Sequence, residues 1–183
     1  MNRFNVFAAA ALTVFSLGLG STLSFAAKKI DIDEDVAKAL SDFHALNSSN
    51  AGLTKQAAGM LVFPHITKGG VGVAGEFGEG VLQVKGKTVG YYSIAGGSVG
   101  LTLGLAKRSE IVLFMTRDAL DDFTHKDGWA FGADANVTAV KSNAGADYDS
   151  LTHKTPIVAF AFGDKGLIGD ASVEGSKITK IKD

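Results

Sequence analysis

Apolar residues alternate with glycine along two stretches of this chain, 70–77 and 99–105. In an extended strand, one side of the first stretch carries Val71, Val73, Gly75 and Phe77, and the other carries Gly70, Gly72, Ala74 and Glu76. The second stretch places Val99, Leu101, Leu103 and Leu105 opposite Gly100, Thr102 and Gly104. A strand with one nearly bare face can bend sharply or admit a close neighbour. The pattern predicts two strands in which glycine has a structural role rather than a catalytic one.

Other stretches show strand periodicity as well: 81–85, 88–95, 110–115, 132–140, 157–162 and 167–173. Short turns at 86–87 and 163–166 connect neighbouring stretches, which favours antiparallel pairing. With the helices described next, the sequence predicts an α+β fold, namely a curved antiparallel β-sheet or partial barrel with flanking α-helices.

Three stretches have helical spacing: 31–46, 48–57 and 117–126. In the first, Val36, Leu40 and Phe43 form an apolar stripe, and acidic residues stand at the start, where the helix dipole favours them. Thr116 is the expected N-cap of the third, and Gly128 is expected to end it. The polar stretch 141–155 predicts a long surface loop within one domain.

Residues 1–26 have the features of a cleaved signal peptide. Arg3 precedes a short apolar run, and small residues at 24 and 26 form a cleavage motif. The apolar run is too short for a stable membrane span. The chain has no cysteine, which excludes disulfides, thiolate metal sites and a lipoprotein anchor. We therefore expect a periplasmic or secreted protein that is not a lipoprotein, with one domain over residues 27–183.

The charge of that domain is nearly balanced. The chain has 18 basic and 19 acidic residues, and cleavage removes only Arg3, so 17 minus 19 gives a net charge of −2. No global field then attracts nucleic acid or an anionic membrane. Any anion site must be local, and nucleic acid is not an expected partner.

Two glycine patterns resemble catalytic motifs. Residues 70–75 satisfy G-x-G-x-x-G, but no helix is predicted after them and no acid follows about twenty positions later, as a dinucleotide site requires. Residues 96–100 satisfy the G-x-S-x-G of a nucleophile elbow around Ser98, which must lead from a strand into a helix. Period-two alternation continues there instead. Chain order would offer Asp122 with His125, or Asp149 with His153, as partners. We expect no enzyme and no catalytic residue.

Other polar side chains have simple structural interpretations. Glu76 and Glu79 are interpreted as solvated turn acids, because strand spacing directs them to opposite faces. The four histidines lack ligand spacing: His44, His65, His125 and His153. Asp118, Asp121 and Asp122 suit the start of a helix. We expect no metal and no cofactor.

Several motifs occur in an order that closely resembles the SYLF domain: 61–70 (LVFPHITKGG), 75–82 (GEFGEGVL), 90–100 (GYYSIAGGSVG), 114–116, 119–120, 128–129, 132–135, 165–167 and 174–178. The resemblance extends over nearly all of residues 27–183. It implies a non-enzymatic lipid-binding module. Eukaryotic members are described as binding phosphoinositides, and fungal members as associating with actin.

The resemblance makes anionic phospholipid, or a membrane surface, the expected partner. The candidate lipid-binding residues are Lys68, Lys107, Arg108, Lys177 and Lys180, each of which is alternatively a solvated surface cation. Lys68 precedes a Gly-Gly turn whose N–H groups can cradle a phosphate. The acids at 31–35 depart from the basic docking helix of the phosphoinositide-binding members. Actin is not expected in the periplasm, and the alternative function is a structural or protein-interaction role with an envelope protein partner.

Overall fold

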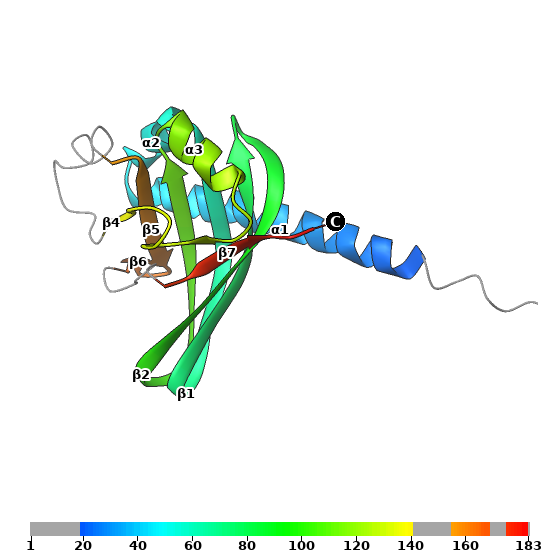
Figure 1. Ribbon diagram of the computed structural model, residues 1–183, viewed down its shortest axis with the longest axis vertical. Helices are drawn as coiled ribbons and strands as arrows, with labels where there is room; N and C mark the ends of the chain where they lie inside the picture. Colours follow the sequence, from blue (N-terminus) through cyan, green and yellow to red (C-terminus); the bar gives the residue numbers. More distant parts are fainter. Residues whose placement is uncertain (1–18, 141–154, 169–174, 183) are drawn as a thin grey trace, which may run out of the picture. The chain divides into compact units, whose positions relative to one another are not determined.

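The computed structural model describes residues 19–140, 155–168 and 175–182. The chain divides into two units, Met1–Asp31 and Ile32–Asp183, and the account below concerns the second. The helices are α1 (Leu19–Leu46), which spans the boundary between the units, α2 (Asn50–Gln56) and α3 (Arg117–Thr124). The strands are β1 (Gly59–Val84), β2 (Lys87–Phe114), β3 (Trp129–Ala130), β4 (Thr138–Val140), β5 (Ile157–Gly163), β6 (Gly166–Leu167) and β7 (Lys177–Lys180). The predicted α+β fold class is confirmed (Figure 1).

The sheet is built on one long antiparallel hairpin of β1 and β2. The two strands pair from Gly59 opposite Phe114 to Val84 opposite Lys87, with a tight turn between them at Lys85 and Gly86. Both turn residues have positive φ, 52° and 74°. This geometry is that of a two-residue hairpin connection, in which glycine carries no steric penalty.

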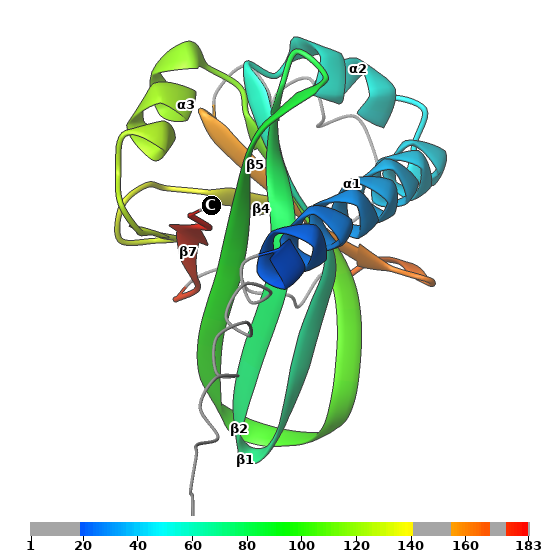
Figure 2. The same cartoon turned by 90° about the vertical axis from the view of Figure 1, so that its right-hand side faces the viewer.

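The hairpin curls back on itself about halfway along its length, as Figure 2 shows. We call 59–70 of β1, paired with 104–114 of β2, the first arm, and 74–84 paired with 87–98 the second arm. The pairing register shifts between them, at Val71 and Val73. Across the curl, the backbone of Gly80 approaches that of Val62 so closely that a Cβ built on Gly80 would lie 2.0 Å from the Val62 carbonyl oxygen. A close backbone approach therefore occurs at Gly80, three residues beyond the stretch 70–77 for which it was predicted.

Short strands extend the two arms. β5 pairs with the first arm from Ser109 to Phe114, and β7 pairs with the second arm from Tyr92 to Ala95. β3 adds to β7, and β4 adds to β5 in parallel orientation. The sheet is therefore mixed, although only antiparallel pairing was predicted, because no short turn joins β4 to β5.

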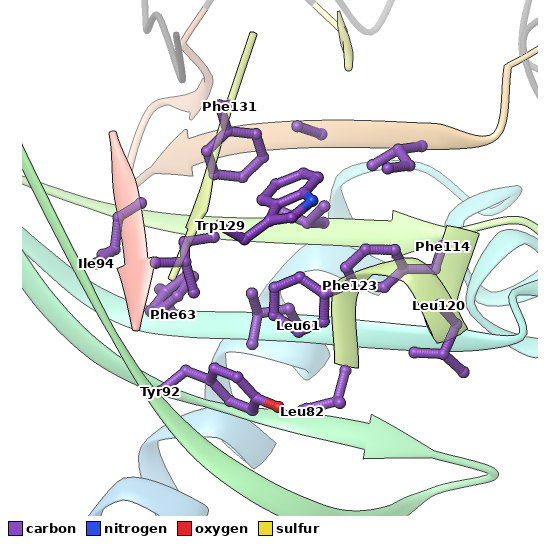
Figure 3. Packing of buried hydrophobic residues seen from close by; sticks show 14 of the residues in the cluster. Leu61, Phe63, Leu82, Tyr92, Ile94, Phe114, Leu120, Phe123, Trp129 and Phe131 are labelled. Atoms are coloured by element: carbon purple, nitrogen blue, oxygen red, sulfur yellow. The ribbon is translucent and has the colours of Figure 1, made fainter. Parts of the chain in front are cut away.

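The inner face of the curled sheet buries an aromatic core (Figure 3). Phe114 on β2 stacks at 4.8 Å, between ring centroids, on Phe123 from α3. Trp129 lies 5.5 Å from Phe123 and 4.8 Å from Phe131. α3 closes this core, and its N-cap Thr116 accepts a 3.2 Å hydrogen bond from the amide of Ala119, as predicted. Burial of several large aromatic rings supplies much of the driving force for folding.

The outer face buries a second core against α1. Val36, Ala39 and Phe43 of α1 pack on outward side chains such as Ile111 and Phe160. The acidic start of this helix segment is bound to the sheet, because the carboxylate of Asp33 accepts hydrogen bonds from the hydroxyls of Thr88 (3.2 Å) and Tyr91 (2.8 Å). The apolar stripe predicted for this helix is therefore a packing surface.

The helix predictions were correct in position, with one difference in length. α1 begins at Leu19 rather than residue 31, so it includes residues that the sequence assigns to the signal peptide. None of the described helices combines the length and apolar character needed to cross a bilayer.

Two strand predictions need correction. The strand predicted at 132–140 forms only over Thr138–Val140, because residues before it make a turn: the Asp134 carboxylate accepts a 2.7 Å bond from the Ala130 amide, and Gly132 has a φ of 85°. In the strand predicted at 167–173, residues 169–173 lie outside the described part of the chain. The same holds for most of the predicted loop at 141–155.

Candidate functional site: an exposed rung and a buried charged cluster

A row of exposed side chains crosses the outer face of the second arm. Phe77 on β1 stands opposite Ala95 on β2, which in turn stands opposite Lys177 on β7. All three residues are exposed, and Phe77 exposes 54% of its surface. Because neighbouring strands lie about 4.8 Å apart, the backbones of Phe77 and Lys177 lie roughly 10 Å apart across the row. We call this row the exposed rung.

Small residues flank the exposed rung on one side, whereas Glu79 and Ser93 form the next pair of this face on the other side. Gly75 and Gly97 form the next cross-strand pair, and both are exposed. A Cβ built on Gly75 would contact nothing within 4 Å, and one on Gly97 would meet only the Ala74 carbonyl oxygen at 3.8 Å. The fold therefore does not require glycine at these positions, and the backbone beside Phe77 carries no side chains there.

A groove of about 550 Å³ lies beside Phe77 and is lined by residues from both halves of β1. Its lining includes Ile32 and Asp35 of α1, His65 from the first arm, and Glu76, Phe77 and Glu79 from the second. His65 and Asp35 approach each other to 3.3 Å at this groove. The groove is therefore partly apolar and partly acidic.

A charged cluster is buried on the inner face, between the arms. The Arg108 guanidinium donates to Glu76 at 3.0 Å and to Glu110 at 3.4 Å, and the Ser176 hydroxyl donates to the other oxygen of Glu76 at 2.7 Å. The side chains of Arg108, Glu76 and Glu110 are only 10%, 9% and 0% exposed. Buried charges of this kind must be paired to be tolerated.

The pairing within this cluster is incomplete. One oxygen of Glu110 and Nε of Arg108 are buried without a hydrogen-bond partner among the described residues. Burial raises the pKa of Glu110 to about 7, although Arg108 acts in the opposite direction. Burial also acts to raise the pKa of Glu76, but hydrogen bonds from Arg108 and Ser176 outweigh it and hold that pKa below its usual value. The two carboxylates therefore ionise in different pH ranges.

The interpretation of Glu76 as a solvated turn acid is wrong. The residue lies in the middle of β1 and binds a buried arginine. The sequence contained a partial signal, because Arg108 and Glu110 stand two apart in a strand and so share a face. It contained no signal for Glu76, since its contact with Arg108 exists only after the hairpin curls.

The structure separates the five candidate lipid-binding residues. Lys68 lies near Glu76, and its charge helps to lower the pKa of that carboxyl. Arg108 is bound within the charged cluster, whereas its neighbour Lys107 is exposed and lines a second groove of about 210 Å³. Lys177 belongs to the exposed rung, and Lys180 is exposed near the other end of β7.

The two catalytic patterns lie in continuous strands. Residues 70–75 are inside β1 and residues 96–100 are inside β2, so neither is followed by a helix. His125 is an exposed residue whose Nδ1 is bonded to the Asp121 carbonyl at 2.7 Å. Asp149 and His153 lie outside the described residues. The local structure that each motif requires is therefore not present.

The remaining histidines have local partners. His44 Nε2 lies 3.0 Å from the Thr54 hydroxyl, and His65 pairs with Asp35. In the part of the chain that the structure describes, no three His, Cys, Asp or Glu side chains gather in a group able to hold a metal ion.

Comparison with known protein families gives one match. Residues 95–183 match the Ysc84 family model, described as "Las17-binding protein actin regulator", which is the SYLF domain. Over residues 95–183, just under half of its length, the chain is similar to the SYLF-domain family. The matched segment contains Ala95, Lys177 and the Arg108–Glu110 pair, while Phe77 and Glu76 precede it. A search of curated proteins finds no significant match to this chain.

Proposed function

We propose that this protein is a non-enzymatic binding module that attaches to anionic phospholipid at the bacterial envelope. The similarity of residues 95–183 to a family of lipid-binding and actin-related binding modules supports a binding role. The observation that favours a membrane is the exposed rung, in which an exposed phenylalanine and an exposed lysine lie on one face of the second arm. Aromatic and basic side chains together suit the boundary between headgroups and acyl chains.

The expected affinity of this surface is modest. Complete burial of a phenylalanine side chain contributes about 1.5–3 kcal/mol, and a lysine near an anionic membrane surface adds about 1 kcal/mol. Together these contributions give about 2.5–4 kcal/mol, which corresponds to a dissociation constant between about 15 mM and 1 mM. Other exposed lysines, such as Lys107 and Lys180, strengthen binding if they reach the same surface. Vesicle lipid at millimolar concentration is therefore the appropriate probe.

This mode of attachment does not use the N-terminal helix. The apolar stripe of α1 is buried against the sheet through Val36 and Phe43, and Asp33 is held by two hydroxyls. A helix bound in this way does not offer its apolar face to a bilayer. The second arm takes that role in our proposal.

The cellular location is part of the proposal and rests on the sequence. The basic start, apolar run and small-residue cleavage motif of residues 1–26 favour export and cleavage after Ala26. The protein then acts in the periplasm or outside the cell, where anionic phospholipid headgroups are accessible.

The test is sedimentation of residues 27–183 with vesicles of neutral or anionic phospholipid, at low and moderate salt. The proposal predicts pelleting with anionic vesicles only, reduced by salt because the lysine contribution is screened. Lys177→Ala should weaken pelleting more than Lys55→Ala, which changes an exposed lysine of α2. Equal pelleting with neutral and anionic vesicles would argue against headgroup recognition.

The second candidate is a protein-interaction role without lipid specificity. A sheet face with an exposed phenylalanine also suits a protein partner. The absence of pelleting with either vesicle type, at millimolar lipid, would favour this alternative.

A further inference from the structure

The buried charged cluster joins parts of the chain that are distant in sequence. Glu76 belongs to the second arm, Arg108 and Glu110 belong to the first, and Ser176 immediately precedes β7. The Arg108–Glu76 ion pair at 3.0 Å therefore connects the two arms directly. Ser176 connects the second arm to the C-terminal strand through its 2.7 Å bond to Glu76.

The absence of a side chain at Gly96 leaves room for the contact between Glu76 and Ser176. A Cβ built on Gly96, which stands opposite Glu76, would lie 2.8 Å from the Ser176 hydroxyl and 2.9 Å from the Glu76 carboxylate. Glycine at this position therefore allows Glu76 and Ser176 to meet. The contact is built into the fold rather than formed by mobile surface chains.

The cluster holds more negative than positive charge when both carboxylates are ionised. Arg108 on β2 is shared between them, and from β1 the charged groups are Glu76 itself and Lys68, whose charge acts on Glu76. Around Glu110, its cross-strand neighbours are uncharged: Phe63 on β1 and Ala161 on β5. Among the described residues, no second cation compensates Glu110, and one of its oxygens has no hydrogen-bond partner.

We infer that the Glu76–Arg108–Glu110 cluster is a proton-sensitive latch that holds the two arms of the hairpin together. With Glu110 protonated, Arg108 and Glu76 form a neutral buried pair and the latch is closed. With Glu110 ionised, two carboxylates compete for one guanidinium in a dry site, which weakens the bond between the arms. Because Phe77 follows Glu76 in β1, release of the latch also alters the presentation of the exposed rung.

The direction and size of the effect follow from linkage. A carboxyl that titrates near 7 in the closed state and near 4.5 once exposed favours opening as pH rises. Between pH 5.5 and pH 8, this difference increases the population of open molecules on the order of tenfold or more. The inference does not depend on lipid binding, and its test uses no lipid.

The experiment is hydrogen–deuterium exchange of the full chain at pH 5.5 and pH 8, corrected for the intrinsic pH dependence of amide exchange. At both pH values, amides of β1 around residues 74–80 should be less protected than amides of β5 at 157–160, because they exchange through opening of the arms, and they should lose protection about tenfold or more at the higher pH. In Glu110→Gln, which is neutral at both pH values, the change at 74–80 should fall below about twofold. Glu34→Gln, on the exposed surface of α1, should behave as the unmodified protein does.

Two results would overturn the latch. One is a pH-independent protection of 74–80 in the unmodified protein, and the other is equal protection of 74–80 and β5 at both pH values, which indicates that residues 74–80 exchange only through global unfolding. If Glu110→Gln does not fold, Glu76→Gln replaces it. Without the charge of Glu76, the Arg108 guanidinium pairs with Glu110 alone. The pH dependence of amide protection at 74–80 should therefore shrink at least severalfold. An unchanged pH dependence would also overturn the latch.

Discussion

Replacement of Gly80 by alanine tests the curled hairpin most sharply. The new methyl carbon would lie 2.0 Å from the Val62 carbonyl oxygen and 2.8 Å from a ring carbon of Phe63. Overpacking a core typically costs 1–3 kcal/mol, and here the obstacle is backbone, which cannot rotate away. We therefore expect a loss of about 3 kcal/mol, which lowers the melting temperature of a domain of this size by roughly 6–12 °C.

The matched control is Gly75→Ala in the same strand, since a Cβ there meets nothing within 4 Å. Its stability should stay within about 1 kcal/mol of the unmodified protein, with any change toward stabilisation through the unfolded state. Urea denaturation followed by circular dichroism measures both variants. If Gly80→Ala proves as stable as Gly75→Ala, the two halves of β1 do not approach each other as described.

Two further predictions concern charged side chains. The folded-state pKa of Glu110 is raised from 4.5 to about 7, so its stabilising contribution is present below pH 4.5 and is lost as pH rises through 7. The unfolding free energy should fall by about 3 kcal/mol over this range, which is measured as a falling urea midpoint. In Glu110→Gln this pH dependence should disappear. A midpoint that rises over this range would contradict the assignment. Asp33→Ala removes both hydrogen bonds that hold α1 and should lower the unfolding free energy by about 1–2 kcal/mol, whereas Glu34→Ala should change it by less than about 0.5 kcal/mol.

The local patterns of the sequence predicted the fold class, but not the length of its two main strands. The alternation at 70–77 and 99–105 correctly indicated strands with a bare face. Each run was interpreted as a separate strand, because residues 78–80 and 96–98 interrupt the period-two pattern. Residues 59–69 of β1 were not predicted as a strand, and in this segment the register shifts between Phe63 and Ile66, on either side of Pro64. A bulge of this kind breaks the sequence pattern while the pairing continues.

β7 was missed for a different reason. Its buried face consists of Ile178 alone, and the lysines at 177 and 180 gave the segment the appearance of a basic tail. A short strand is recognised from the sheet it joins rather than from its own residues. The candidate site could likewise be predicted only in part. Lys177 was identified from its charge, but its alignment with Phe77 depends on the pairing of β1, β2 and β7.

The measurement that tests the proposed membrane attachment most directly is the fluorescence of Phe77→Trp with phospholipid vesicles. The chain has one other tryptophan, Trp129, which is only 2% exposed and so contributes a nearly constant signal. Val89→Trp, at a site with 53% exposure near the hairpin turn, is the control. Our account predicts a blue shift of the residue 77 signal with anionic vesicles, reversed by salt, and no shift at residue 89. An unchanged spectrum at residue 77 while the protein pellets with the vesicles would contradict it.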